Sequence, residues 1–323
     1  NNLRLMQIEN FLTSSGIEFK KKIEGKNITY LRTGGIINLY ITPKNEFEFT
    51  NLILFLKVNK LKFIIIGLSC NSMLCDEKTY DIVICTRKLS GYKFSLDNTI
   101  EVECGLTMPK LALIMLHNSI TGFELLEGIP GSIGGGIFMN ASTFDCQISD
   151  HLLSVKFLDS NANVTTLQKK DLNFSFRSSI FHNLEGYILS AKFDAGRKGN
   201  SEEIQNKMKK YKNIRLKMLE YDKPNLGSNF CTFDIYNEIA KYNPGYKILI
   251  TILKKLRLDI VFGNKFLNFI TSLYFGWKKY PYSKKTLNSF YKTEKIGSKE
   301  LIELIDAIKY VTKNKLRLEI RIF

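Results

Sequence analysis

Residues 121–142 read TGFELLEGIPGSIGGGIFMNAS and place six of the chain's 21 glycines between positions 122 and 136. Glycine is needed where the backbone adopts a positive φ, or where it approaches a ligand with no room for a Cβ atom. Successive backbone N–H groups in such a turn can form a concave anion site that suits a pyrophosphate. No Gly-Lys-Ser/Thr follows, and the GxGxxG order is absent, so P-loop, Rossmann and kinase interpretations fail. The glycine spacing alone leaves open a phosphate-binding turn or a tight turn inside a sheet.

The positive charge of the chain is concentrated in its last third. The 323 residues include 47 Lys and Arg against 31 Asp and Glu, a net charge of +16. Residues 1–200 hold 22 basic and 19 acidic side chains (net +3), and residues 201–323 hold 25 and 12 (net +13). A basic chain suggests a polyanionic partner in general. The distribution restricts that suggestion to the region after residue 200.

Several classes of protein are disfavoured by composition. No run of about 18 apolar residues occurs, so we expect no membrane insertion. The first residues lack the apolar block of a secretory signal. The six cysteines form no CxxC pair and the three histidines are far apart, so we expect no metal site. Scattered cysteines in a chain of this size indicate free thiols in a reducing cytoplasm, and we expect a cytoplasmic protein.

Strand and helix patterns alternate through the first half of the chain. Short β-branched runs predict strands at 36–41, 62–66, 82–85 and 99–104, and apolar spacing predicts helices near the N-terminus, after Pro43 and at 108–117. Strand patterns return between 152 and 193. A polar break at 195–200 precedes a long helix predicted over 202–219. This is mixed α/β or α+β architecture, and the length indicates two or three lobes.

The order of residues in the glycine segment resembles a known flavin signature. Gly122-Phe123-Glu124, GIPGSIGG at 128–135 and Met139-Asn140-Ala141 resemble the flavin-binding segment of UDP-N-acetylenolpyruvoylglucosamine reductases (UDP-N-acetylmuramate dehydrogenases). In that family the segment lines the pyrophosphate and isoalloxazine of non-covalently bound FAD. The resemblance therefore implies cofactor contacts from Gly128, Ile129, Pro130, Gly131, Ser132, Gly134, Gly135 and Asn140.

The same resemblance implies a fold. It is α+β, with a two-lobed FAD-binding unit of the vanillyl-alcohol-oxidase (PCMH) type followed by a C-terminal α/β substrate domain. We expect the first FAD-binding lobe at 1–90, the second at 91–200 and the substrate domain at 201–323.

Two earlier turns are also similar to family motifs. RTGG at 32–35, with Pro43 eight residues after Gly35, is similar to the family's first glycine pair. GLSCNS at 67–72 is similar to its glycine-rich Ser-Asn turn, although Leu68 and Ser69 stand where the family prefers glycines and Cys70 replaces a serine. The resemblance implies further FAD contacts from Gly34, Gly35, Gly67, Ser69, Cys70, Asn71 and Ser72.

Three downstream motifs imply the catalytic residues. FSFRSSIF at 174–181 resembles the family's Tyr-Arg-x-Ser-x-Phe element, with Phe176 at the tyrosine position. KPNLGSNF at 223–230 is similar to the Gly-Ser/Cys-x-Phe motif that carries the proton donor. LEIR at 318–321 resembles the Glu-Val-Arg near the family's C-terminus. The resemblance covers roughly residues 25–232 and 300–323, and 233–299 shows nothing of the family pattern.

The family reaction gives these residues their implied roles. NADPH reduces FAD, and hydride from the flavin N5 then reduces an enolpyruvyl ether to a lactyl ether. Arg177 would hold the substrate carboxylate and stabilise its enolate charge. Ser228 would protonate the α-carbon, and Glu319 would orient Arg177 or share the stabilisation.

Each of these residues also has a structural interpretation. Arg177 could form a surface salt bridge, Ser228 could be a turn residue or helix cap, and Glu319 could be an exposed strand residue. Cys231 is either a second candidate proton donor or a packed thiol.

The basic, aromatic stretch at 241–285 has three interpretations. It contains ten Lys or Arg and one acidic residue, interleaved with Tyr, Phe and one Trp. This composition is typical of a nucleic-acid surface, but it also suits a lobe that grips a nucleotide-sugar diphosphate. A lysine-rich solvated face over an aromatic core is the third interpretation.

The resemblance implies an FAD- and NADPH-dependent oxidoreductase of peptidoglycan precursor synthesis. It would reduce UDP-N-acetylglucosamine enolpyruvate to UDP-N-acetylmuramate, with a small nucleotide sugar as partner and no nucleic acid. One alternative is a related flavin reductase of another sugar enolpyruvyl ether in surface-polysaccharide synthesis. Another is a catalytically silent homologue that acts as an anion-binding module.

Overall fold

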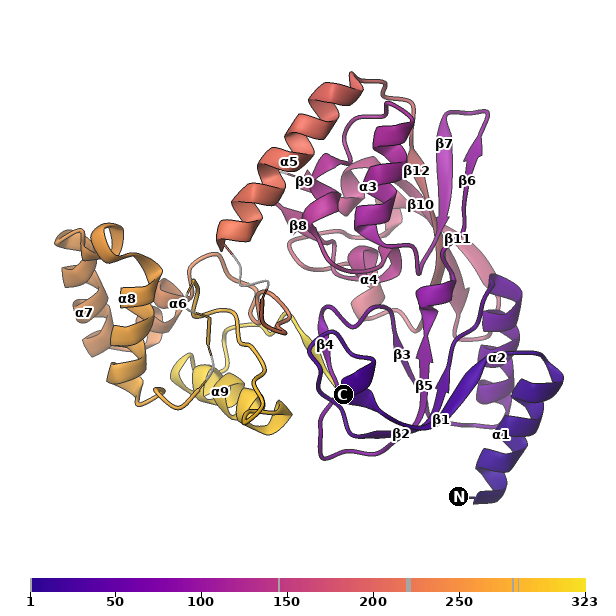
Figure 1. The fold of residues 1–323 in the computed structure, drawn as a ribbon, viewed down its shortest axis with the longest axis horizontal. Coiled ribbons are helices and arrows are strands. Elements are labelled where there is room, and N and C mark those ends of the chain that lie inside the picture. The colour runs from indigo at the N-terminus through magenta and orange to yellow at the C-terminus, as the bar shows by residue number, and fades with distance from the viewer. Residues whose placement is uncertain (1, 145, 219–221, 281, 284) are drawn as a thin grey trace. The chain divides into compact units, whose positions relative to one another are not determined.

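The fold consists of two compact units (Figure 1). The computed structural model describes residues 2–144, 146–218, 222–280, 282–283 and 285–323. The first unit comprises Asn1–Ile23, Ile36–Leu68 and Thr79–Asn213. The second comprises Glu24–Gly35, Ser69–Lys78 and Ile214–Phe323. Two short early segments therefore belong with the C-terminal part of the chain.

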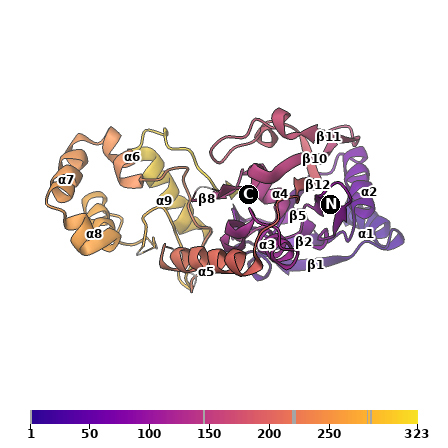
Figure 2. The same ribbon diagram turned by 90° about the horizontal axis from the view of Figure 1, so that it is seen from above.

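A four-stranded sheet opens the first unit, in the order β1-β2-β5-β3. Its strands are β1 (Phe19–Glu24), β2 (Ile36–Ile41), β3 (Ile64–Ile66) and β5 (Tyr80–Cys85). Both β2 and β3 run parallel to β5, and β5 is almost wholly buried, as parallel strands covered on both faces are. Helices α1 (Asn2–Ser14) and α2 (Glu46–Val58) lie side by side (Figures 1 and 2) and bury apolar residues with those of the sheet.

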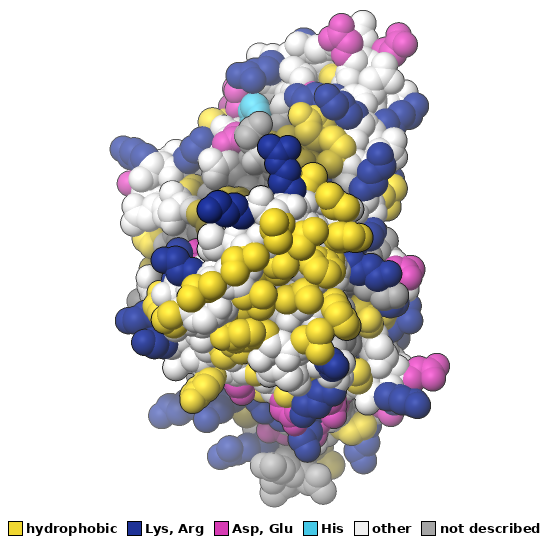
Figure 3. Space-filling view, turned by 90° about the vertical axis from the view of Figure 1, so that its left-hand side faces the viewer, with side chains coloured by type: hydrophobic (Ala, Val, Ile, Leu, Met, Phe, Trp, Pro, Cys, Tyr) yellow, Lys and Arg dark blue, Asp and Glu magenta, His cyan; other side chains and the backbone are white. Residues whose placement is uncertain are grey.

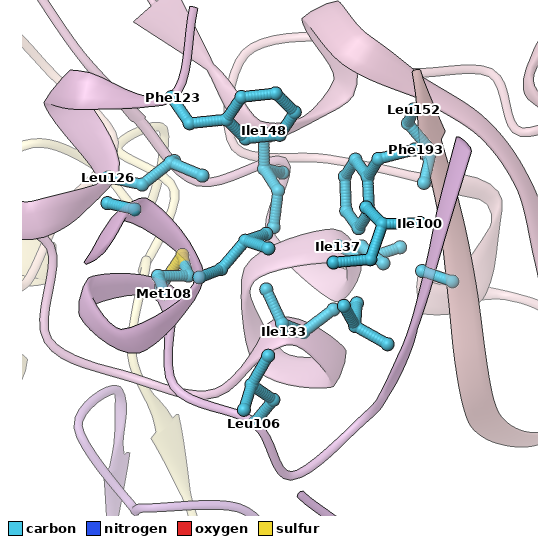
Figure 4. Packing of buried hydrophobic residues seen from close by; sticks show 14 of the residues in the cluster. Ile100, Leu106, Met108, Phe123, Leu126, Ile133, Ile137, Ile148, Leu152 and Phe193 are labelled. Atoms are coloured by element: carbon cyan, nitrogen blue, oxygen red, sulfur yellow. The ribbon is translucent and has the colours of Figure 1, made fainter. Parts of the chain in front are cut away.

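A five-stranded antiparallel sheet forms the rest of the first unit, in the order β11-β10-β12-β7-β6. The strands are β6 (Tyr92–Ser95), β7 (Thr99–Glu103), β10 (Leu152–Asp159), β11 (Val164–Gln168) and β12 (Gly186–Asp194). Helices α3 (Met108–His117) and α4 (Ile133–Phe138) pack against it. Figure 4 shows that Ile133 and Ile137 of α4 lie close to Ile100 of β7 and Phe193 of β12. This core fixes the position of the glycine segment. Two-residue strands β8 (Ser142–Thr143) and β9 (Cys146–Gln147) pair just after α4.

The second unit is mainly helical. It contains α6 (Ile235–Tyr242), α7 (Pro244–Lys255), α8 (Leu258–Phe275) and α9 (Ser298–Val311) around a core that includes Phe230, Tyr246 and Leu304. A short parallel pair joins β4 (Ser72–Met73) to β13 (Arg321–Ile322). The early segment 69–78 is therefore fastened to the last residues of the sequence.

Most predicted elements agree with the structure. The strands at 36–41, 64–66, 80–85 and 99–103 and the helix at 108–117 confirm the pattern-based predictions, and the mixture of sheets and helices confirms the α+β class. The long helix is α5 (Ser201–Met218), and residue 219 lies outside the described residues. We keep the three lobes at 1–90, 91–200 and 201–323 as a proposal. The two units divide within α5, at residues 213 and 214.

The described residues contain no helix long and apolar enough to cross a bilayer. Within the same residues, no group of three or more His, Cys, Asp or Glu side chains is arranged to hold a metal ion, and no disulfide forms.

Candidate functional site

The glycine segment is a turn held on both sides by backbone hydrogen bonds. Ile133 N–H donates to the Leu106 carbonyl (2.8 Å), and Met108 N–H donates to the Gly131 carbonyl (3.0 Å). Ser132 begins α4, where its Oγ accepts from Gly135 N–H at 3.3 Å. Gly131 has φ 135°, a value that favours glycine. In the described part of the chain, the N–H groups of Gly131 and Ser132 donate to no other protein group.

Glycines line the surface of this turn. A Cβ atom on Gly67 would lie 2.4 Å from Ser132 Oγ, so the 67–68 turn approaches the glycine segment directly. Gly135 is exposed, and a Cβ there would have only Ser132 Oγ within 4 Å, at 3.5 Å. Available N–H donors beside an open, glycine-lined face fit the pyrophosphate of FAD. The predicted residues Gly67, Gly131, Ser132 and Gly135 are thus brought together.

Asn140 provides a second test of the fit to a cofactor. Its side chain is 1% exposed, and its Nδ2 donates to Gln147 Oε1 (2.8 Å) and to the Ser175 carbonyl (3.1 Å). Its Oδ1 is buried and accepts no hydrogen bond from the described residues. An unpaired buried acceptor costs about 1–3 kcal/mol, so such atoms usually have a partner. The oxygen fits an N–H donor such as the one on the isoalloxazine ring.

Arg177 lies in a tight turn that is fastened to the end of α4. Ser175 and Ser178 exchange backbone hydrogen bonds (3.1 and 3.2 Å), and Arg177 between them has φ 53°. The Arg177 guanidinium donates through Nη1 to the Ser142 carbonyl (3.1 Å) and Oγ (2.9 Å). Ser179 Oγ donates to the Phe138 carbonyl at 2.7 Å. Together with the Asn140–Ser175 bond, these contacts hold Arg177 beside the glycine segment.

A buried carboxylate stabilises the start of the glycine segment. Glu124 accepts from Thr121 Oγ1 (2.6 Å) and Gly122 N–H (2.9 Å), and Lys207 Nζ lies 3.6 Å from its Oε1. Burial acts to raise the pKa of Glu124, but these donors and the ammonium hold the pKa below its usual value. Gly122 has φ 107°, and a Cβ there would meet the His151 ring at 2.3 Å. The ion pair therefore fixes a corner that only glycine can form.

In the second unit, the Asn71, Ser228 and Glu319 segments meet. Asn71 Nδ2 donates to the Glu319 carbonyl (3.0 Å), and Arg321 N–H donates to the Asn71 carbonyl (3.0 Å). Glu319 N–H donates to the carbonyl of Asn229 at 2.8 Å, which places Glu319 opposite the residue that follows Ser228. Ser228 and Glu319 are both partly exposed. The structure thus brings together the segments of three predicted residues that are distant in the sequence.

An asparagine that the sequence analysis did not identify holds the Ser228 segment. Asn288 Oδ1 accepts from Phe230 N–H (2.9 Å), and its Nδ2 donates to the Phe230 carbonyl (2.9 Å). The Asn288 carbonyl accepts from both the N–H (2.8 Å) and the Nδ2 (3.0 Å) of Asn229. Asn288 lies in 233–299, where no family motif marks it. Ser142, the partner of Arg177, was missed because only its neighbours belong to the glycine signature.

Five other predicted cofactor residues lie in the two earlier turns. Gly34 (φ 126°) donates its N–H to Asp76 Oδ1 at 2.7 Å, and a Cβ on Gly35 would lie 2.1 Å from the Lys78 carbonyl oxygen. Ser69 adopts φ 54° in a turn, and its Oγ accepts from Tyr30 N–H at 2.8 Å. A non-glycine residue in that conformation costs about 1–2 kcal/mol, so glycine would be favoured at this position. Ser72 lies in β4, and Cys70 is half-buried.

Comparisons with known proteins agree on one family. A family model described as an FAD binding domain matches residues 37–168. The UDP-N-acetylenolpyruvoylglucosamine reductase of Prochlorococcus marinus subsp. pastoris is 34% identical over 216 residues, which are 66% of this chain and 73% of that protein. The protein of the same name from Streptococcus suis is 33% identical over 219 residues, 68% of this chain and 72% of that protein.

A solved structure shares the fold. The UDP-N-acetylenolpyruvylglucosamine reductase from Thermus caldophilus matches with a TM-score of 0.67 at 19% identity, covering 95% of this chain and 99% of that chain. At this identity the match describes the fold alone.

Proposed function

Because the chain belongs to the UDP-N-acetylenolpyruvoylglucosamine reductase family, whose members are FAD-dependent oxidoreductases, we propose that it reduces UDP-N-acetylglucosamine enolpyruvate to UDP-N-acetylmuramate. FAD is its cofactor, and NADPH is the proposed reductant. In the net reaction the carbon–carbon double bond gains a hydride and a proton, and NADPH becomes NADP⁺. The proposed setting is peptidoglycan precursor synthesis in the cytoplasm.

The position of Arg177 is the observation that carries this proposal. Its turn is fastened to the segment that fits FAD by the Asn140–Ser175 bond and by the two bonds to Ser142. A guanidinium fixed in this way can pair with a carboxylate and stabilise the negative charge that develops on it during reduction. Because the group is held before substrate arrives, little reorganisation is needed at the moment of reaction.

The second unit supplies the proposed proton donor. FAD, when bound, supplies the hydride chemistry, and the chain supplies placement and electrostatics. Ser228 carries an O–H proton next to Asn229, whose backbone and side chain are held by Asn288. A serine hydroxyl is a weak acid, so its position determines whether it can protonate a developing carbanion. Glu319, opposite Asn229, is proposed to assist in stabilising the enol.

The first experiment tests for the flavin. Protein purified with added FAD should absorb near ~450 nm, as flavoproteins do. NADPH oxidation is then followed with and without UDP-N-acetylglucosamine enolpyruvate, and the substrate should accelerate it. A protein that stays colourless after incubation with FAD contradicts the proposal.

The second experiment tests the role of Ser228. Ser228→Ala should keep the reduction of FAD by NADPH but slow its reoxidation by substrate by about 10²–10⁴-fold, the usual contribution of a positioned acid. Ser228→Cys, which retains an ionisable hydrogen, should recover part of the rate. If Ser228→Ala reoxidises at the wild-type rate, Ser228 is not the donor, and Cys231 becomes the next residue to test.

A different sugar substrate is the second candidate. The matched relatives align with about two-thirds of this chain, and residues 233–299 show no family motif. If a flavin-containing protein oxidises NADPH without stimulation by UDP-N-acetylglucosamine enolpyruvate, the enolpyruvyl ether of another sugar becomes the preferred substrate. A protein that binds FAD but reduces no such ether would be a catalytically silent homologue.

A further inference from the structure

Helices α7 and α8 present an unusually apolar surface to solvent. Nine large apolar or aromatic side chains there are exposed: Ile248, Ile252, Leu256, Ile260, Val261, Phe262, Phe269, Leu273 and Tyr274. We call these nine residues the α7–α8 surface. Figure 3 shows hydrophobic side chains gathered in the middle of this face, with Lys and Arg at its edges. An exposed patch of this size usually marks an interaction site.

The outer side of α7 is as apolar as the side that faces the core. Ile248, Ile252 and Leu256 follow at four-residue spacing and therefore line one side. Tyr246, Ile250 and Leu253 are buried on the other side. An amphipathic surface helix normally presents polar residues outward, whereas a helix that is apolar on both sides is normally covered on both. The sequence of α7 therefore predicts a partner on its outer side.

The start of α8 forms an apolar tip. Ile260, Val261 and Phe262 are consecutive and are 74%, 68% and 59% exposed. Gly263 follows with φ 66° and ψ −171°, which breaks the helix after the tip. Successive helical residues point about 100° apart, so these side chains project in three directions. A flat protein partner would cover one of those directions, whereas a fluid lipid layer surrounds all of them.

Positive charge lies on the same two helices and at their junction. Lys247, Lys255, Arg257 and Lys265 are exposed, and none of them forms an ion pair with another described residue. Asp259 is the single acidic residue in 241–285, and it is half-buried. Exposed apolar side chains bordered by unpaired cations are typical of proteins that lie on anionic membranes.

We propose that the α7–α8 surface docks this protein onto an anionic lipid bilayer, with the tip at the headgroup–acyl boundary and the cations on lipid phosphates. The docking is peripheral and needs no spanning helix, in agreement with the absence of one among the described residues. This role goes beyond the proposed reductase function and does not depend on it. It also assigns a partner to the stretch of sequence that carries no family motif.

Vesicle co-sedimentation tests the proposal with full-length protein containing FAD. Vesicles of 40% phosphatidylglycerol in phosphatidylcholine are compared with vesicles of pure phosphatidylcholine. Wild-type protein should pellet with the anionic vesicles, bind the neutral ones at least about tenfold more weakly, and be released by 0.5 M NaCl because salt screens the charge. Failure to pellet with the anionic vesicles at low salt overturns the proposal.

Two sets of variants separate the apolar contribution from the charge. Ile260→Ser/Val261→Ser/Phe262→Ser should weaken binding at least about tenfold, because the inserted apolar area is lost. Its control, Phe47→Ser/Val58→Ser/Leu96→Ser, removes apolar residues of the first unit that are at least as exposed and should bind normally.

The charge variants test whether the exposed cations contribute to binding. Neutralising the four cations to Gln should weaken binding by roughly 600-fold at low salt, since each contributes about fivefold. Lys62→Gln/Lys93→Gln/Lys110→Gln/Lys170→Gln is the matched control on exposed lysines of the first unit. The emission of Trp277, the chain's single tryptophan, which is 5% exposed in the second unit, reports whether the second-unit variants are folded, and retention of FAD reports the same for the first-unit controls. If the variants and their controls bind equally, the surface is not the docking site.

Fluorescence quenching by lipid, and the molecular mass from light scattering, show whether the α7–α8 surface binds a bilayer or a second copy of the protein. In a Trp277→Phe background, Phe262→Trp should be quenched by vesicles of acyl-brominated lipid, whereas Phe47→Trp should not. If wild-type protein is instead a dimer that the Ile260/Val261/Phe262 triple variant converts to a monomer, the surface joins two copies and the membrane proposal is wrong. Retention of wild-type protein on soluble polyanions with no loss in the triple variant would also overturn it, because charge alone would then explain binding.

Discussion

The contact between Gly67 and Ser132 gives a double-mutant prediction. A Cβ on Gly67 would lie 2.4 Å from Ser132 Oγ but 3.4 Å from Ser132 Cβ, so only the hydroxyl obstructs alanine. In Gly67→Ala, either Ser132 Oγ turns away and loses its bond to Gly135 N–H, or the backbone shifts. The first costs about 1 kcal/mol and the second about 1–3 kcal/mol. We expect Gly67→Ala to lower the free energy of unfolding by about 1–3 kcal/mol.

Removing the hydroxyl should remove the obstruction. Ser132→Ala alone loses the helix cap and should cost about 1 kcal/mol. The double variant Gly67→Ala/Ser132→Ala has ordinary Cβ–Cβ contact, so it should be about as stable as Ser132→Ala. The coupling is then about 1–3 kcal/mol, well above the few tenths expected of independent sites.

Urea unfolding followed by circular dichroism measures all four proteins. The reasoning is refuted if the two single costs simply add, or if Gly67→Ala is as stable as wild type. The dissociation constant of FAD, measured by flavin fluorescence, should rise in each single variant, since both residues line the face that fits the pyrophosphate.

Three further predictions concern Asn140, Asn288 and His151. Asn140→Ala removes two hydrogen bonds made by a buried side chain and should lower the free energy of unfolding by about 1–3 kcal/mol in urea titration; a cost below about 0.5 kcal/mol would exclude it as the anchor of the Arg177 turn. Asn288→Ala breaks both bonds to the Phe230 backbone, and unfolding followed by tryptophan emission should show a loss of about 2–3 kcal/mol, with slower reoxidation of FAD by substrate. Burial lowers the pKa of His151 below its usual 6.5, so the folded state favours the neutral ring. The neutral ring therefore contributes its full stabilisation above about pH 6.5, and this stabilisation is lost as the pH falls through the lowered pKa. His151→Gln should flatten the decline in stability below pH 6.5, whereas the exposed His117→Gln should not; equal slopes in all three proteins would rule out this role.

Local patterns predicted local structure well. The helix at 108–117 follows from its apolar spacing, and the structure adds a cap in which Thr107 Oγ1 accepts from Lys110 N–H at 3.1 Å. The strands of the first sheet follow from short β-branched runs, because a buried parallel strand needs apolar residues on both faces. Such signals lie within a few residues of the element that they predict.

Contacts between residues that are distant in the sequence have no comparable local pattern that would predict them. The need for glycine at Gly67 arises from Ser132, which is 65 positions later, and no spacing rule connects them. The family motifs predicted Arg177 and Ser228, but not the side chains that hold them. Ser142 accepts two hydrogen bonds from the Arg177 guanidinium, and the Asn288 side chain makes two with the Phe230 backbone. The sequence around Asn288 has no motif. The assignment of 24–35 and 69–78 to the second unit is likewise a property of tertiary packing.

The pairing of β4 with β13 also orders events during biosynthesis. Asn71 and Glu319 are 248 positions apart, and Arg321 and Phe323 complete the pairing with Asn71 and Met73. At about 5–20 residues per second, the ribosome needs roughly 12–50 s to add that length. The first unit contains no residue beyond 213, so its chain is complete before these partners emerge. The 69–78 segment must therefore wait for its strand partner while the rest of the protein is still being translated, and a chaperone that binds exposed strand edges would find its target there.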